Sequence, residues 1–355
     1  MGAVRQVHVH IGPYKSGTTY VQNVLWRNRE LLASRGVLVP RGVWPAQRRA
    51  VAALLRRVAD LPAEPPRGPA GRVRPRDPWD RLVAEVEASD AHTAVVSVER
   101  LCEAEADDVA ALAESLAPAR VDVVYTARNL AWAIPGGWQT LLRTRFSPTW
   151  REYLDSVREP SGPAWYGRQF WRRQDPSAVL PPWLAHLPVD RVHVVTVPVG
   201  RADPALLWER FCAATGLDPV GADLDVSRSN VSLGGVEAEA LRRLTARTAE
   251  VLSARAYLDV VNHFVARDVL ERREQSFRLE LSESEHGWAR ARADEAVAYL
   301  RGAGLHVVGD LDDLLPDLPQ GIREPDDVSE AEVLALTTEV LAATVVELAR
   351  RTYER

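Results

Sequence analysis

Hydrophobic residues follow two different periods along the first two thirds of the chain. Four short β-branched runs predict buried strands, at 4–11, 93–98, 121–126 and 192–197. In the segments between these runs, apolar residues recur three or four positions apart, as they do on one face of a helix. Strands that alternate with helices predict an α/β fold, with a mostly parallel sheet flanked by helices.

The pattern becomes mainly helical from about residue 236 onward. Near the end of the chain, Ser329 and Glu332 have the spacing of a capping box, which predicts a last helix at about 330–352. We therefore expect an α/β core over 1–235, and a helical C-terminal region over 236–355 that packs on this core.

The turn between the first strand and the first helix has the features of a phosphate-binding loop. Gly12 and Gly17 bracket the turn, and Thr18 and Thr19 stand at the start of the helix. In such turns, free backbone N–H groups and the positive end of the helix dipole converge on one anion. The sequence therefore predicts a P-loop type of sheet with an anion site after its first strand.

The position of the lysine narrows the choice of ligand. Gly12 and Gly17 have the spacing of the ATP-type loop GxxxxGK[ST], but Thr18 occupies the place of the lysine. The lysine is Lys15, inside the turn, and it is the only lysine of the chain. A lysine there suits a 5′-phosphate whose outer group is transferred, rather than a β,γ-diphosphate chelated to magnesium.

The run from His10 to Gln22, HIGPYKSGTTYVQ, resembles the 5′-phosphosulfate loop of sulfotransferases that use 3′-phosphoadenosine 5′-phosphosulfate (PAPS). It is especially similar to the HIGPxKxGTTxxQ form of bacterial members. The resemblance implies that the cofactor PAPS is bound by Gly12, Pro13, Tyr14, Lys15, Ser16, Gly17, Thr18 and Thr19. It also implies that Lys15 stabilises the charge on the bridging oxygen as the S–O bond breaks, with no metal ion required.

Sulfotransferases bind the 3′-phosphate with an arginine at the end of the strand that corresponds to 121–126. The matching residue here is Arg128. A serine about eight residues later usually assists, but that position is Gly136, so a backbone N–H would have to replace the missing hydroxyl. The alternative for Arg128 is a surface ion pair.

A second polar segment is expected near the same phosphate. Similar bacterial sequences carry an SNxSL stretch, which is matched here by 229–233. The resemblance implies that Arg228, Ser229 and Asn230 close over the 3′-phosphate. A plain turn followed by a helix cap is the alternative, because serine and asparagine favour such turns.

Two residues are candidates for the general base that takes the proton from the acceptor. Glu99 follows the predicted strand 93–98, at the edge of the sheet where ligands bind. His10 directly precedes the turn and is the rival base, although a histidine within a buried strand is often a core residue. The sequence leaves the choice between Glu99 and His10 open.

Composition and charge exclude several classes of protein. The net charge of −5 disfavours a broad nucleic-acid surface. No apolar run approaches the roughly 20 residues that span a bilayer, and the two cysteines form neither a metal-ligand pattern nor a disulfide framework. We therefore expect a cytoplasmic enzyme with a small-molecule or carbohydrate acceptor.

Tryptophans gather in 132–183, either around an acceptor pocket or in the core.

Two other functions stay open beside sulfuryl transfer. An ATP-dependent small-molecule kinase could share the fold, although the missing lysine after Gly17 counts against it. A nucleotide-binding protein that has lost sulfotransferase activity is the other alternative, because Asn129 and Gly136 stand where relatives often have aspartate and serine. The acceptor, and whether it is a hydroxyl or an amine, cannot be inferred from the sequence.

Overall fold

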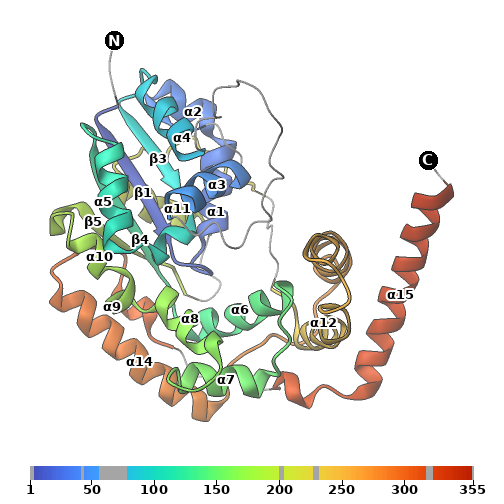
Figure 1. Cartoon of the computed structure of the whole chain (residues 1–355). Helices are drawn as coiled ribbons and strands as arrows, with labels where there is room; N and C mark the ends of the chain where they lie inside the picture. The colour runs from blue at the N-terminus through green and yellow to red at the C-terminus, as the bar shows by residue number, and fades with distance from the viewer. Residues whose placement is uncertain are drawn as a thin grey trace. The chain divides into compact units, whose positions relative to one another are not determined.

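The structure is a computed structural model that describes residues 4–40, 44–55, 78–199, 204–226, 232–316 and 323–353 (Figure 1). The chain divides into two compact units. The first unit comprises 1–129, 172–227 and 294–315, and the second comprises 130–171, 228–293 and 316–355. Each unit takes residues from both sides of position 235, and the domain division expected between 235 and 236 stays a prediction.

A six-stranded sheet forms the centre of the first unit. Its strands are β1 (Gln6–Gly12), β2 (Val37–Leu38), β3 (Thr93–Ser97), β4 (Arg120–Ala127), β5 (Val192–Thr196) and β6 (His306–Val308). The spatial order is β2-β3-β1-β4-β5-β6, and every neighbouring pair is parallel. The predicted α/β fold class is confirmed. The strands that follow β1 in the chain lie on both sides of it: β2 and β3 on one side, and β4, β5 and β6 on the other. The carboxyl end of β1 is therefore at the switch point of the strand order, where such sheets bind ligands.

Helices cover both faces of this sheet. They are α1 (Thr18–Arg27), α2 (Arg29–Ser34), α3 (Trp44–Leu54), α4 (Pro78–Glu87), α5 (Ala106–Ser115), α9 (Pro176–Val179), α10 (Pro181–Leu184) and α11 (Pro204–Thr215). Side chains from α3, α4, α5, α9 and α10 share one apolar core with the sheet, whereas those of α1, α2 and α11 share another.

The alternation of side chains along β1 explains this division. Val7, Val9 and Ile11 belong to the first core, whereas His8 and His10 point to the opposite face, on which His10 packs edge-on against Phe211 of α11. The β1 strand therefore buries an apolar row on one face and two histidines on the other.

The second unit is helical. It contains α6 (Leu130–Arg143), α7 (Trp150–Arg158), α12 (Gly235–Thr248), α13 (Ala254–Ala256), the π-helix η4 (Tyr257–Leu270) and α15 (Glu330–Tyr353), with parts of α8 (Trp165–Gln174) and α14 (Glu283–Gly302). The predicted capping box is present: the Ser329 amide donates to Glu332 Oε2 over 3.0 Å, and the Glu332 amide donates to Ser329 Oγ over 3.3 Å.

Helix α6 contains three residues that disfavour a helix interior, Pro135, Gly136 and Gly137. It nevertheless runs without a break from Leu130 to Arg143. Tertiary packing explains the glycine, because a Cβ on Gly137 would lie 2.3 Å from the hydroxyl oxygen of Tyr153. Gly137 therefore serves close packing of α6 on α7 rather than a turn.

The aromatic residues of 132–183 divide between core and surface. Trp138 is fully buried and packs edge-on against Trp150, with ring centroids 5.4 Å apart. Its indole N–H donates to the carbonyl oxygen of Pro148 over 3.0 Å. Trp138 is therefore a core residue, whereas Trp165 is exposed.

Candidate active site

The turn between β1 and α1 has an unusual backbone. Gly12, Lys15 and Gly17 have φ angles of 84°, 65° and 82°, all in the left-handed region. Glycine adopts this region readily, but for a residue with a side chain it costs about 1–2 kcal/mol. Anion-binding nests are built from turns that contain such left-handed residues, and strained residues cluster at functional sites. The local conformation therefore fits the anion site that the sequence predicts.

Both glycines of the turn are also required by their neighbours. A Cβ on Gly17 would lie 2.5 Å from Cδ2 of Leu207 in α11, and a Cβ on Gly12 would lie 2.9 Å from Cα of Glu99. Gly17 immediately precedes Thr18, the first residue of α1, and its carbonyl oxygen accepts from the amides of Tyr20 and Val21. Close packing thus fixes both ends of the turn.

Beneath the turn lies a buried network of hydroxyl groups. Ser16 is fully buried, and its Oγ donates to the carbonyl oxygen of Pro13 over 2.6 Å. Thr126, near the end of β4, lies with its Oγ1 2.5 Å from Ser16 Oγ and donates to the carbonyl oxygen of Gly12 over 3.0 Å. Thr126 was not among the predicted site residues, and its only sequence signal is a hydroxyl within the apolar run VDVVYTA.

His10 belongs to the same network. Its Nε2 lies 3.3 Å from Thr126 Oγ1, and its Nδ1 lies 2.8 Å from Ser97 Oγ. The side chain is completely buried, and this burial lowers the pKa of His10 to about 3, so the ring is neutral at pH 7. Both nitrogens are therefore engaged inside the protein, as in a residue that supports the turn.

Glu99 lies beside the turn on the other side. It is the first residue of the short helix η2 (Glu99–Glu103), one residue after the end of β3, and it is partly exposed. Gln22 of α1 donates through Nε2 to Glu99 Oε2 over 3.0 Å and to the carbonyl oxygen of Ser97 over 3.2 Å. A helix that starts at the turn thus orients the carboxylate, and Gln22 is the last residue of the HIGPxKxGTTxxQ pattern.

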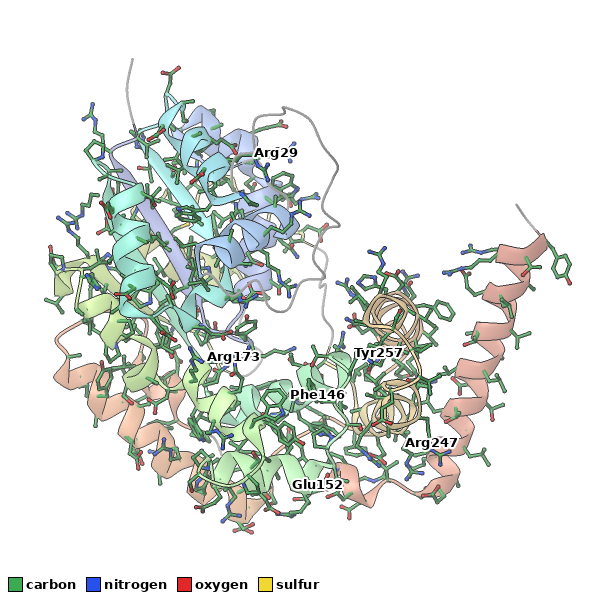
Figure 2. The ribbon with its side chains drawn as sticks, in the orientation of Figure 1. Arg29, Phe146, Glu152, Arg173, Arg247 and Tyr257 are labelled. Carbon is green, nitrogen blue, oxygen red and sulfur yellow. The ribbon has the colours of Figure 1, made fainter. Side chains whose placement is uncertain are left out.

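Tyr14 is held by the last residues of α8. The guanidinium of Arg173 (Figure 2) stacks over the Tyr14 ring at 4.6 Å and donates to Glu103 Oε1 over 3.0 Å. Gln174 Nε2 donates to the carbonyl oxygen of Tyr14 over 2.7 Å, and Tyr125 donates to the carbonyl oxygen of Gln174 over 3.0 Å. These contacts brace the turn from a segment about 160 residues away, which no local sequence pattern revealed.

Arg128 reaches the turn from the residue that follows β4. Its Nη1 donates to the carbonyl oxygen of Lys15 over 2.6 Å, and both residues are half-buried. The side chain of Arg128 thus lies against the turn that contains Lys15. The separate roles expected of the two cations, Arg128 at the 3′-phosphate and Lys15 at the 5′-phosphosulfate, stay predictions. Thr18 is buried at the start of α1, and Thr19 beside it is half-buried.

The remaining predicted residues lie elsewhere. Gly136 is part of the second unit, within α6, where its carbonyl oxygen accepts from Thr140 Oγ1 over 2.9 Å. Arg228, Ser229 and Asn230 lie outside the described residues. The proposed 3′-phosphate contacts of all four residues stay predictions.

The described side chains form neither a metal-binding cluster nor a membrane-spanning helix. Within the described ranges, no group of three or more histidine, cysteine, aspartate or glutamate side chains could hold a metal ion. Asp310 instead caps a short helix, accepting from the amide of Asp312 over 2.9 Å. None of the helices in the described parts of the chain combines the length and apolar character needed to cross a membrane.

Comparison with known proteins gives a distant similarity. No family model matches the chain, and no curated protein does. Among solved structures, the chain is similar to the crystal structure of a sulfotransferase from Alicyclobacillus acidocaldarius, with 18% sequence identity and a TM-score of 0.40. The alignment covers 74% of this chain and 97% of that protein. A similarity this distant establishes neither a family nor a function.

Proposed function

We propose that this protein is a sulfotransferase that moves a sulfuryl group from PAPS to a hydroxyl or amine of a small molecule or carbohydrate. The observation that carries the proposal is the turn after β1. It holds the lone lysine of the chain in a left-handed conformation at the carboxyl end of the central strand, and parallel sheets bind ligands at this edge.

The residues of the turn fit a donor with two anionic groups. The backbone of 12–19 would hold the 5′-phosphosulfate, and Arg128 would hold the 3′-phosphate as a charged, planar donor. PAPS supplies the activated sulfuryl group when bound. Lys15 then stabilises the negative charge of the leaving phosphate, and the amides at the start of α1 add their dipoles.

We assign the general base to Glu99 rather than to His10. Glu99 is partly exposed, lies against Gly12 and is oriented by Gln22. His10 is fully buried, and both of its ring nitrogens lie within hydrogen-bond distance of hydroxyls inside the protein. A base must come within about 2.6–3.2 Å of the acceptor proton's oxygen or nitrogen, which a partly exposed carboxylate beside the turn can do.

A nucleotide ranking by thermal shift tests the proposal. We expect 3′,5′-adenosine bisphosphate to raise the melting temperature without magnesium. At about 100 times its dissociation constant, this ligand would add roughly 2.7 kcal/mol to the free energy of unfolding. ATP with magnesium would stabilise the protein much less. The reverse ranking would contradict the proposal and favour a kinase.

Turnover separates an active enzyme from one that only binds the nucleotide. Release of 3′,5′-adenosine bisphosphate from PAPS should depend on an added acceptor, drawn from a panel of phenols, alcohols, amines and saccharides. Nucleotide binding without turnover on any of these acceptors would favour a protein that has lost its activity.

A further inference from the structure

Three consecutive carbonyl groups in the turn after β1 each accept a hydrogen bond from a side chain. In chain order, the donors and the residues whose carbonyl oxygens accept are Ser16 Oγ to Pro13 over 2.6 Å, Gln174 Nε2 to Tyr14 over 2.7 Å, and Arg128 Nη1 to Lys15 over 2.6 Å. These carbonyl oxygens therefore point toward donors that belong to the protein.

Fixing the carbonyl groups also fixes the amides that follow them. In a trans peptide, the C=O group and the N–H group of the next residue share one plane and point in opposite directions. The N–H groups of Tyr14, Lys15 and Ser16 are therefore directed away from the three donors. Lys15 and Gly17 have positive φ angles and Ser16 between them does not, and alternation of this kind gathers successive N–H groups into an anion-binding nest.

Gln174 brings its donor to the turn from a firmly held position. It is the last residue of α8 and is half-buried. Its own carbonyl oxygen accepts from the hydroxyl of Tyr125 over 3.0 Å, and Tyr125 is buried in β4. The next residue, Asp175, caps α9 by accepting from the amide of Ser177 over 2.9 Å. The backbone at Gln174 is thus attached to the sheet, so its side chain acts on the turn from a fixed point.

The three donors differ in what else they do. Arg128 carries a charge that would itself attract an anion, and Ser16 belongs to the hydroxyl network with Thr126. In the described part of the chain, the side chain of Gln174 makes one hydrogen bond, the one to Tyr14. A neutral amide adds no charge to an anion site, so its removal changes the orientation of the turn without changing the charge of the site.

We propose that Gln174 is a positioning residue for sulfuryl transfer. By holding the carbonyl group of Tyr14, it turns the amide of Lys15 toward the anionic group of the sulfuryl donor and fixes the backbone from which the Lys15 side chain extends. This inference rests on the proposed function. Because misplacement by about 1 Å can cost roughly 10²-fold in rate, we expect Gln174→Met to lower kcat by about that factor.

The only lysine of the chain gives a direct reporter of this orientation. Protein made with ¹⁵N-labelled lysine shows a single backbone amide signal by NMR, that of Lys15. On addition of inorganic pyrophosphate, this amide proton should shift downfield in wild type, because it donates to the anion. Gln174→Met should lose most of the shift, and so should Gln174→Glu, which keeps the length of the side chain. No shift in wild type, or a full shift in both variants, would overturn the proposal.

The matched control is Gln6→Met. Gln6 also donates through Nε2, to Asp122 Oδ2 over 3.0 Å, but at the opposite end of β1. This control should keep the Lys15 shift, the pyrophosphate affinity and the turnover of wild type. Gln174→Met should lower pyrophosphate affinity by about 10-fold, as for one hydrogen bond to a charged group. Equal losses of affinity in the two variants would contradict a specific role of Gln174.

The two readouts separate this inference from the proposed function. A wild-type protein that binds pyrophosphate and does not turn PAPS over would refute the proposed function alone. The Lys15 signal would then still decide whether Gln174 orients the turn toward an anion. Wild-type turnover in Gln174→Met would overturn the inference and leave the proposed function intact.

Discussion

Gly12 and Glu99 are so close that no other residue fits at position 12 without movement. A Cβ added to Gly12 would lie 2.9 Å from Cα of Glu99 and 3.0 Å from its Cβ, and the φ angle of Gly12 is +84°. The tip of the turn and the candidate base are thus packed directly against each other. This contact couples the shape of the predicted phosphate loop to the position of the carboxylate.

The substitution Gly12→Ala should destabilise the protein through two effects, the left-handed backbone and the clash with Glu99. We expect it to lower the free energy of unfolding by about 2–4 kcal/mol, measured by urea denaturation. Gly216→Ala is the matched control, because Gly216 has φ +68° and no atom within 4 Å of an added Cβ. The control isolates the backbone effect, about 1–2 kcal/mol. Equal losses in the two variants would show that the packing against Glu99 contributes nothing.

The substitution Glu99→Gln tests the proposed base. Glutamine keeps the shape of the side chain and cannot accept the proton as a carboxylate does, so turnover should fall by about 10²–10⁴-fold with nucleotide affinity nearly unchanged. His10→Gln is the comparison, and it should reduce stability more than turnover because it alters a buried network. A Glu99→Gln enzyme that keeps more than about a third of wild-type turnover would refute the assignment. Collapse of turnover in His10→Gln alone, in a folded protein, would transfer the role to His10.

The substitution Lys15→Ala should affect turnover more than binding. The charge of Lys15 matters most as the leaving group becomes negative, so its removal acts on the transition state rather than on the bound donor. We expect kcat to fall by at least about 10²-fold, as for loss of one oxyanion donor, with a smaller change in affinity for 3′,5′-adenosine bisphosphate. Steady-state kinetics and isothermal titration separate the two quantities. An equal loss in both would place Lys15 in binding alone.

The substitution Arg128→Ala tests the site for the 3′-phosphate. Arg128 donates to the carbonyl oxygen of Lys15 in this structure, so its removal also disturbs the turn. Arg173→Ala is the matched control, because Arg173 stacks on Tyr14 of the same turn but has no proposed contact with a phosphate. Arg128→Ala should lower the affinity for 3′,5′-adenosine bisphosphate by about 10- to 100-fold. The variant should then bind this nucleotide no more tightly than adenosine 5′-monophosphate. Arg173→Ala should lower the affinity for both nucleotides by the same factor. An intact preference in Arg128→Ala would refute the assignment.

The sequence predicted those parts of the fold that depend on neighbouring residues. The four β-branched runs predicted β1, β3, β4 and β5, and the spacing of Ser329 and Glu332 predicted the cap of α15. The turn after β1 was recognisable from Gly12 to Thr19, because strand, glycines and helix start follow one another directly.

Distant packing decided what could not be predicted. Gly137 lies inside α6 because the hydroxyl of Tyr153 in α7 leaves no room for a Cβ at position 137. Thr126 supports the turn across 110 residues, and Gln174 across 160. In each case the partner is selected by the three-dimensional fold rather than by a local pattern.

The two histidines of β1 should make the protein sensitive to mild acid. Burial lowers the pKa of His8 to about 4 and that of His10 to about 3, from the usual 6.5. Both rings are thus neutral in the folded protein, whereas the unfolded chain binds protons near pH 6.5. Their contribution is fully present above pH 6.5 and is lost as the pH falls toward the folded pKa values, since the unfolded state then binds more protons.

Each histidine should contribute up to about 1.4 kcal/mol per pH unit in this window. We therefore expect the free energy of unfolding to fall by roughly 4 kcal/mol between pH 7.5 and pH 5, measured by urea denaturation at fixed ionic strength. His8→Gln should remove about half of this dependence whatever its effect on stability at pH 7.5, because glutamine does not titrate. A His8→Gln slope equal to that of wild type would show that His8 is not held neutral by the fold.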